Sequence, residues 1–209
     1  MSTPLSPLIH LIDDDDAVRT SLALLISTVG LRVQTWADPQ SFVQDFDRQC
    51  IGAIVLDVRM PGISGLTVLD TLQAQGVDQP VIMLTGHGTV DMCRRAFKSG
   101  ATEFLEKPVD DERLLEALQN AVRQHVKSRQ RHQTDRQTRT SYAQLSERER
   151  EVLGLIVAGL TNKEMGRALG VSPRTVETHR ANLFAKLRIE SLAQLVRQYA
   201  ALVDEQASP

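Results

Sequence analysis

The sequence has only two cysteines, and it lacks both a long apolar run and a secretory leader. Cys50 and Cys93 are too few for a disulfide framework and have no metal-ligand spacing, so a reduced compartment is expected. No apolar run approaches the roughly 18–20 residues that a membrane helix needs. Residues 1–7 contain no basic stretch followed by an apolar one, as a secretory signal would. We therefore expect a cytoplasmic protein with no membrane partner.

The composition is that of an ordinary globular protein, but its charge is unevenly distributed. The chain has 209 residues, of which 42% are hydrophobic and 24% charged, which suits two domains or one large α/β domain. Residues 1–118 carry a net charge of −8 and residues 119–209 a net charge of +6. This asymmetry indicates different partners for the two halves. Most of the basic excess precedes residue 142, so net charge alone does not identify the last 68 residues as DNA-binding.

The first 118 residues alternate short β-like runs with amphipathic helical segments. The expected strands are Leu8–Ile12, Arg32–Thr35, Ala53–Asp57, Val81–Thr85 and Glu103–Glu106. The expected helices are Ala17–Val29, Pro39–Phe46, Leu66–Gln75, Val90–Ser99 and Asp110–Val126, and Gly30, Gly76 and Gly100 close three of them. This alternation predicts an α/β doubly wound, five-stranded parallel sheet in a domain spanning residues 1–126.

The remaining chain divides into a polar stretch and a helical domain. Residues 127–141 contain no large apolar residue and form either a solvated continuation of the preceding helix or a flexible linker. Residues 142–209 are predicted to form an all-α four-helix domain, with helices at Glu147–Ala158, Asn162–Leu169, Pro173–Leu187 and Ser191–Val203. The starts of these helices are marked by two capping boxes, Ser146 with Glu149 and Thr161 with Glu164, and by Ser172 before a proline.

Acidic and basic residues follow the strands at one edge of the predicted sheet. Asp13 and Asp14 follow the first strand, Asp57 ends the third, and Lys107 follows the fifth. Ligands of doubly wound sheets bind at this carboxyl edge, and Mg²⁺ is the usual partner of clustered carboxylates. A carboxylate beside Mg²⁺ and a cation can attack a phosphoryl group. Thr85, at the end of the fourth strand, can hydrogen-bond a phosphoryl oxygen. For Asp15 and Asp16 the favoured interpretation is a helix N-terminal acid cluster.

The segments "LIDDDDAVR", "IVLDVRMPGISG", "VIMLTGHG" and "FLEKPV" resemble the receiver domains of bacterial two-component response regulators, over nearly all of residues 8–126. The wording "LTGHG" and "EKPV" is similar to the FixJ subfamily. The resemblance implies that Asp57 is the phosphoacceptor and that Lys107 contacts the phosphoryl group. It also implies a cis bond between Lys107 and Pro108.

The same resemblance assigns the metal ligands and the switch residues. Mg²⁺ would be bound by Asp14 and Asp57, by Asp13 through water, and by the backbone carbonyl of Arg59. Thr85 and Phe104 would form the switch pair.

Residues 162–187 have the pattern of a helix-turn-helix. Met165, Leu169, Val171 and Val176 are the expected core positions, Gly166 is the small residue and Gly170 the turn. The segment "LSEREREVLGLIVAGLTNKEMGRALGVSPRTVETHRANLFAKL" resembles the LuxR-type DNA-binding domain, although that family usually has alanine at the position of Gly166.

The second helix of this motif is expected to enter the major groove. Glu177, Thr178 and Ala181 match the base-facing positions of the family, with Arg180 nearby, and Glu177 can accept a hydrogen bond from cytosine. The residues expected to meet DNA phosphates are Lys163, Ser172, Arg174, Thr175, His179 and Lys186.

Together these patterns predict a transcriptional response regulator that is not an enzyme beyond its own Mg²⁺-dependent phosphorylation and dephosphorylation. The expected partners are a sensor histidine kinase, promoter DNA, RNA polymerase and, once phosphorylated, a second copy of the chain. One alternative is a Mg²⁺-dependent phosphohydrolase with an aspartate nucleophile, although "LDVRMPG" lacks a second aspartate two positions after Asp57. The other is a receiver whose output binds RNA or protein, although residues 142–209 offer few aromatic side chains for stacking.

Overall fold

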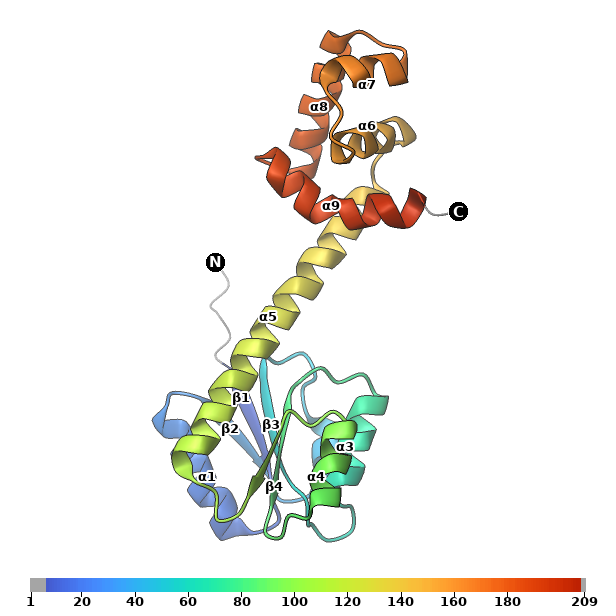
Figure 1. Ribbon diagram of the computed structural model, residues 1–209. Coiled ribbons are helices and arrows are strands. Elements are labelled where there is room, and N and C mark those ends of the chain that lie inside the picture. The colour runs from blue at the N-terminus through green and yellow to red at the C-terminus, as the bar shows by residue number, and fades with distance from the viewer. Residues whose placement is uncertain (1–6, 208–209) are drawn as a thin grey trace. The chain divides into compact units, whose positions relative to one another are not determined.

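The computed structural model describes residues 7–207 and divides into two compact units, Met1–Arg129 and Gln130–Pro209 (Figure 1). All but one of the seven N-terminal residues considered above for a signal lie outside the described residues. Within residues 7–207, none of the helices combines the length and apolar character required to cross a bilayer.

A five-stranded parallel sheet forms the centre of the first unit, in the order β2-β1-β3-β4-β5. The strands are β1 (Leu8–Ile12), β2 (Arg32–Trp36), β3 (Gly52–Asp57), β4 (Val81–Thr85) and β5 (Glu103–Glu106). This confirms the predicted doubly wound fold, and only β2 and β3 are each one residue longer than expected. The chain reverses its direction of travel across the sheet between β1 and β3, so the topological switch point lies at the carboxyl ends of these two strands.

The helices of the first unit are α1 (Asp16–Thr28), α2 (Pro39–Asp45), α3 (Gly65–Ala74), α4 (Val90–Lys98) and α5 (Asp111–Ala143). Polar side chains cap the N-termini of α1 to α4, namely Asp15, Asp38, Ser64 and Thr89. Asp15 and Asp16 are therefore the cap and first turn of α1, as the sequence indicated. Gly30, Gly76 and Gly100 have the expected positive φ angles of 77°, 68° and 89°.

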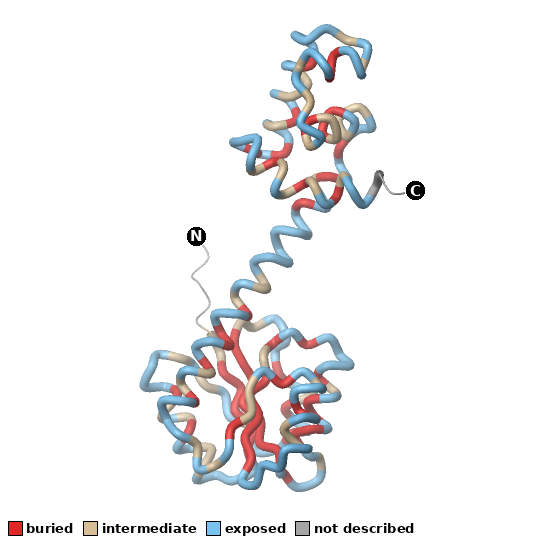
Figure 2. The backbone as a smooth tube through the Cα atoms, viewed as in Figure 1, coloured by how far each residue is buried: buried red, intermediate tan, exposed pale blue. Residues whose placement is uncertain are grey.

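Both faces of the sheet are covered by apolar clusters. One cluster joins β-strand residues to α2, α3 and α4, with Phe42 and Leu69 fully buried. The other joins the opposite face to α1 and α5, with Ile26 and Leu118 fully buried. Because each face is covered, β3 and β4 are buried along their whole length, as Figure 2 shows in red.

Helix α5 is much longer than the predicted Asp110–Val126, because residues 127–141 are helical. Most of these residues are exposed, but they include good helix formers such as glutamine and arginine. Arg129 is tied to the first unit, and Thr138 and Tyr142 are buried in the second. The domain limits expected from the sequence, 1–126 and 142–209, stay predictions.

The second unit contains α6 (Glu147–Val157), α7 (Asn162–Leu169), α8 (Pro173–Leu187) and α9 (Leu192–Ala207), together with the end of α5. Both predicted capping boxes are present, and Ser172 accepts a hydrogen bond from the backbone of Thr175. Met165 and Val176 are fully buried in a single core, and Leu169 and Val171 pack against it. A Cβ atom at Gly166 would lie 2.8 Å from the carbonyl oxygen of Val171, so the missing side chain lets the turn approach α7 closely.

Candidate functional sites

One lysine joins two carboxylates at the switch point of the sheet. Asp13 follows β1, Asp57 ends β3, and both are almost completely buried. The Nζ atom of Lys107 lies 2.6 Å from Oδ2 of Asp13 and 2.7 Å from Oδ1 of Asp57. The peptide bond between Lys107 and Pro108 is cis, as the resemblance implied. The structure therefore brings together three of the residues predicted from the ends of separate strands.

The titration of this cluster follows from its burial and from the sharing of one ammonium. Burial raises the pKa of Asp57 and the charge of Asp13 raises it further, which outweighs the opposing effect of Lys107 and of the Arg59 backbone amide. Burial lowers the pKa of Lys107, but its bonds to Asp13 and Asp57 more than offset this, so that pKa lies above its usual range. One ammonium thus neutralises only part of the negative charge of two carboxylates.

The donor set at this edge fits a hard divalent cation. Mg²⁺ is commonly held by one or two carboxylates with several waters, and Asp13 and Asp57 supply two carboxylates whose charge Lys107 does not balance. The backbone amide of Arg59 donates to Oδ2 of Asp57 at 2.8 Å, which fixes that carboxylate. Asp14, by contrast, is exposed, and among residues 7–207 no three acidic, histidine or cysteine side chains form a group able to hold a metal by themselves.

The predicted switch residues lie on the two strands that follow β3 across the sheet, Thr85 on β4 and Phe104 on β5. Thr85 is completely buried, and its hydroxyl donates to the carbonyl of His87 at 3.2 Å and accepts from the amide of His87 at 3.3 Å. Phe104 is half-buried against the core on the same face. Added to Gly88, a Cβ atom would meet the Phe104 ring at 3.2 Å and the Thr85 methyl at 3.4 Å, so this loop closes tightly over both residues.

Two glycines near this edge were missed by the sequence interpretation. A Cβ atom at Gly65 would lie 2.0 Å from the carbonyl oxygen of Asp57, so only glycine lets the start of α3 approach β3 so closely. At Gly88 the restriction is milder, because the nearest atoms belong to the side chains of Phe104 and Thr85, at 3.2 and 3.4 Å. The glycines of "GISG" and "TGHG" were the available signal, but the close approach that requires them is visible only in three dimensions.

The predicted base-facing residues of the second unit lie on α8. Glu177, Thr178 and Ala181 are exposed, while Arg180 is half-buried. The guanidinium of Arg180 donates to Oδ1 of Asn162 at 2.7 Å, and Nδ2 of Asn162 donates to Oε1 of Glu177 at 3.4 Å. Asn162, the first residue of α7, therefore binds both Arg180 and Glu177, a role that no sequence pattern predicts.

Most of the residues predicted to meet phosphates are also exposed. This group contains Lys163, Ser172, Arg174, Thr175 and Lys186, with His179 half-buried. Ser172 already serves as the cap of α8, and Lys186 forms an ion pair with Glu149 at 2.7 Å. Both side chains would exchange these partners to reach a phosphate.

Comparison with protein families gives one match for each unit. Residues 9–119 match the family described as "Response regulator receiver domain", and residues 143–199 match "Bacterial regulatory proteins, luxR family". The two matches cover the acidic edge and the helix-turn-helix, respectively.

Several characterised relatives are similar over most of the chain. The transcriptional regulatory protein FixJ of Azorhizobium caulinodans is 44% identical over 192 residues, which is 90% of each chain. The tetrathionate response regulatory protein TtrR of Salmonella typhimurium is 37% identical over 201 residues, covering 96% of this chain and 94% of the relative.

Solved structures give the same result. The response regulator StyR superposes with a TM-score of 0.82 at 36% identity, covering 94% of this chain and 99% of StyR. Full-length FixJ from B. japonicum has a TM-score of 0.59 at 39% identity, covering 93% and 96%.

Proposed function

Since this chain belongs to the response regulators that join a receiver domain to a luxR-type DNA-binding domain, we propose that Asp57 accepts a phosphoryl group from a sensor histidine kinase and that the phosphorylated form binds promoter DNA. The observation that carries this proposal is the buried Asp57 carboxylate at the tip of β3, held by an ammonium that also binds Asp13.

In the transfer step, an Asp57 oxygen attacks the phosphorus of a phosphohistidine. A P–O bond forms as the P–N bond breaks, and the electron pair of that bond leaves with the imidazole of the kinase. Asp57 reacts as its carboxylate, and Lys107 stabilises this form in spite of burial. Lys107 then faces the phosphoryl oxygens, and the Arg59 amide keeps the second carboxylate oxygen in place.

Receiver domains generally use Mg²⁺ at this site, and Asp13, Asp14, Asp57 and the Arg59 carbonyl would hold it here. When bound, it would neutralise the charge that develops on the transferring oxygens. The partial charge balance between Lys107 and its two carboxylates supports this assignment.

The phosphoryl group would act on the rest of the receiver through Thr85 and Phe104. Among residues 7–207, the Thr85 hydroxyl is bound only to the neighbouring His87 backbone, so it can exchange these bonds for a phosphoryl oxygen. That movement would vacate space beside Phe104, whose ring would turn inward and reshape the surface of α4 and β5. A bias of a few kcal/mol is enough to shift such a two-state element.

The reshaped surface would pair two copies of the chain, so that two α8 helices read a two-fold DNA site. The exposure of Glu177, Thr178 and Ala181 supports their role in base contact. RNA polymerase is the further partner expected for such a regulator, and the cytoplasm is its expected compartment. The family matches favour this function over a phosphohydrolase or an RNA-binding output.

Labelling by acetyl phosphate tests the acceptor. With Mg²⁺, the wild type is expected to gain a hydroxylamine-sensitive phosphoryl group, as an acyl phosphate should, and Asp57→Asn to gain none. Asp45→Asn, which changes an exposed carboxylate on α2, should label at the wild-type rate. Undiminished labelling of Asp57→Asn would exclude Asp57 as the acceptor.

Base selection from a random duplex library tests α8. Glu177→Ala is expected to lose the preference at one base pair, by about 1–3 kcal/mol, because the acceptor for a cytosine amino group is gone. Glu190→Ala removes an exposed carboxylate just beyond α8 and should leave the selected site unchanged. If both variants select the same site as the wild type, Glu177 does not read a base.

A further inference from the structure

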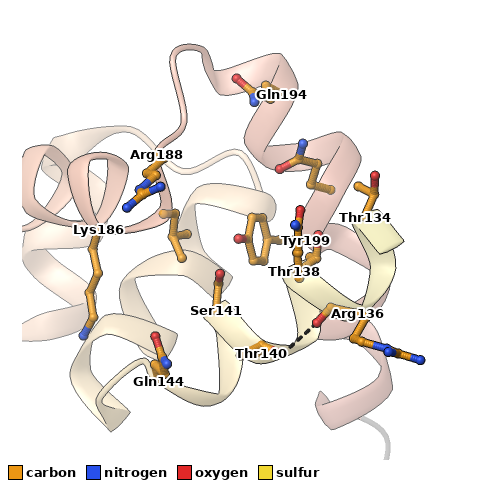
Figure 3. Close-up of a pocket in the computed structure, with 13 residues that line it drawn as sticks. Thr134, Arg136, Thr138, Thr140, Ser141, Gln144, Lys186, Arg188, Gln194 and Tyr199 are labelled. Atoms are coloured by element: carbon orange, nitrogen blue, oxygen red, sulfur yellow. Dashed lines mark hydrogen bonds between the residues drawn. The ribbon is translucent and has the colours of Figure 1, made fainter. Parts of the chain in front are cut away.

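The second unit contains a polar cavity whose lining includes only one of the predicted DNA contacts, Lys186. Its volume is about 620 Å³, within the range of small-molecule sites. It lies between the end of α5, the C-terminal end of α8 and the first turns of α9 (Figure 3). All of its lining residues lie within the second unit, so the cavity is a property of that unit alone.

The charge of this cavity is entirely positive. Its lining includes Arg136, Lys186 and Arg188, and it contains no aspartate or glutamate. Lys186 is paired with Glu149 outside the lining. In the described part of the chain, the guanidiniums of Arg136 and Arg188 have no hydrogen-bond or ion-pair partner. The lining therefore includes two arginines whose charge is not compensated and a lysine whose charge is partly compensated.

Neutral hydrogen-bond donors complete the lining. Figure 3 shows Lys186 and Arg188 on one side, with Ser141 and Tyr199 between them and Arg136, whose guanidinium extends away from the others. Tyr199 is almost completely buried, and burial raises its pKa against the opposing bond from Ser141, so the phenol keeps its proton. Gln144 and Gln194 add amide groups. Lys186 and Arg188 are thus the cations best placed to hold an anion, and Arg136 adds charge at the rim.

We propose that this cavity binds a phosphate group. Arg188, which has no carboxylate partner among the described residues, and Lys186, which Glu149 compensates only in part, favour an anion with more than one negative charge. A phosphate monoester carries about −1.5 to −2 at neutral pH. Arg188 offers a planar set of donors and Lys186 a point charge, the combination that binds tetrahedral oxyanions. The group belongs either to a small phosphorylated molecule or to a DNA strand. The binding requires neither phosphorylation of Asp57 nor base recognition by α8.

Titration of the full-length protein with inorganic phosphate, at constant ionic strength against chloride, tests the proposal. The amide resonances of Arg188 and Gln194 should shift in a saturable way. Arg188→Gln should weaken phosphate binding about tenfold, since a charged hydrogen-bond donor is lost. Arg197→Gln makes the same change of charge on the exposed face of α9, outside the cavity, and should bind as the wild type does.

The Arg188→Gly variant is a control for misfolding as the cause of a loss of phosphate binding in Arg188→Gln. Arg188 has a left-handed backbone, with φ of 54°, which glycine adopts without strain, so this variant is expected to fold at least as well as the wild type. It should bind phosphate as weakly as Arg188→Gln. A wild-type response no greater than with chloride, or equal responses of the Arg188 and Arg197 variants, would overturn the proposal.

Non-specific duplex DNA distinguishes the two sources of the phosphate. If a DNA strand supplies it, Arg188→Gln should reduce the slope of log affinity against log salt by about 1, and Arg197→Gln should not. If the source is a small molecule, both variants should keep the wild-type slope while only Arg188→Gln loses the response to inorganic phosphate. Either result supports the site, and neither depends on the outcome of the Asp57 labelling.

Discussion

His10 is a buried polar residue in the middle of an aromatic cluster. It is completely buried on β1, and its ring lies near those of Trp36, Phe42 and Phe46. The indole of Trp36 donates to Nδ1 at 3.2 Å, so Nε2 carries the proton, and among the described residues Nε2 has no partner. Burial lowers the pKa of His10 to about 4, although the charge of Asp47 opposes this.

This environment predicts that the receiver loses stability in mild acid. The unfolded state binds a proton near pH 6.5 and the folded state only near pH 4, so the contribution of His10 is complete above pH 6.5 and is lost as the pH falls toward 4. The loss is on the order of 3 kcal/mol. Urea unfolding followed by the fluorescence of Trp36, the single tryptophan, measures it. His10→Leu should flatten the pH dependence, and His132→Gln, on the exposed face of α5, should not. Parallel curves for wild type and His10→Leu would refute this role.

At the scale of residues, type and position were enough to predict that Asp13, Asp57 and Lys107 meet at one edge of the sheet, while their roles and that of Thr85 stay predictions. The carboxyl ends of parallel strands lie at one edge of the sheet, so reactive side chains at the ends of different strands lie close together there. Gly65, Asn162 and His10 could not be found in this way. Their importance comes from a close approach or a partner that is distant in sequence, and many residues of the same types have no such role.

At the scale of elements, α5 is fastened to the first unit by two side chains one turn apart. His125 is buried, and its Nδ1 lies 3.0 Å from the carbonyl oxygen of Gly52. Arg129 donates to Nε2 of His125 at 3.2 Å, to Asp78 at 2.8 Å and to the Arg48 carbonyl at 2.8 Å. Nδ1 of His125 also lies 3.2 Å from the backbone nitrogen of Gly52, so the tautomer of the ring decides whether Nδ1 donates to the carbonyl of Gly52 or accepts from its amide.

Removal of this fastening is expected to destabilise the receiver. Arg129→Ala removes a charged donor from Asp78 and from the Arg48 carbonyl, and because both acceptors are exposed to water the expected cost is about 1 kcal/mol in the free energy of unfolding. Arg131→Ala, two residues further along and exposed, should change it little. Urea unfolding monitored at Trp36 compares the two variants. Equal stabilities would show that these contacts contribute nothing measurable.

The start and end signals of most helices could be predicted from local chemistry, since capping residues and glycines act within one turn. The end of α5 could not. The composition of residues 127–141 is compatible with a helix and with a solvated coil. The helix is favoured by the burial of Thr138 and Tyr142 and by the hydrogen bonds of Arg129, which the sequence does not show.

At the scale of the whole molecule, the proposed pairing of two chains needs an apolar surface on the receiver. On α4, Val90 is 78% exposed and Phe97 is 47% exposed. They line a cavity of about 570 Å³ together with Phe104. Phe104, the proposed switch residue, therefore lies beside the apolar surface of α4 that it would control.

This arrangement predicts that Phe97→Asp blocks dimerisation without preventing phosphorylation. A charge in the centre of an apolar contact should weaken association at least about tenfold. Sedimentation velocity of the beryllofluoride–Mg²⁺ form measures association, and acetyl phosphate labelling measures Asp57 independently. Leu24→Asp makes a similar change at a side chain of α1 that is 70% exposed and should still dimerise. If Leu24→Asp prevents dimerisation and Phe97→Asp does not, the interface lies on α1 and not on α4.

The cavity beside α4 also contains Cys93, a half-buried thiol, while the other cysteine, Cys50, lies at the end of the sheet where β3 begins. Burial and the nearby Asp47 raise the pKa of Cys50, which lowers the fraction of the reactive thiolate, and Cys50 lies away from α4. Cys93 would become inaccessible whenever a second chain covers α4. The ratio of the alkylation rate of Cys93 to that of Cys50 therefore measures how far a second chain covers α4. Cys93 is the reporter, and Cys50 is the internal standard.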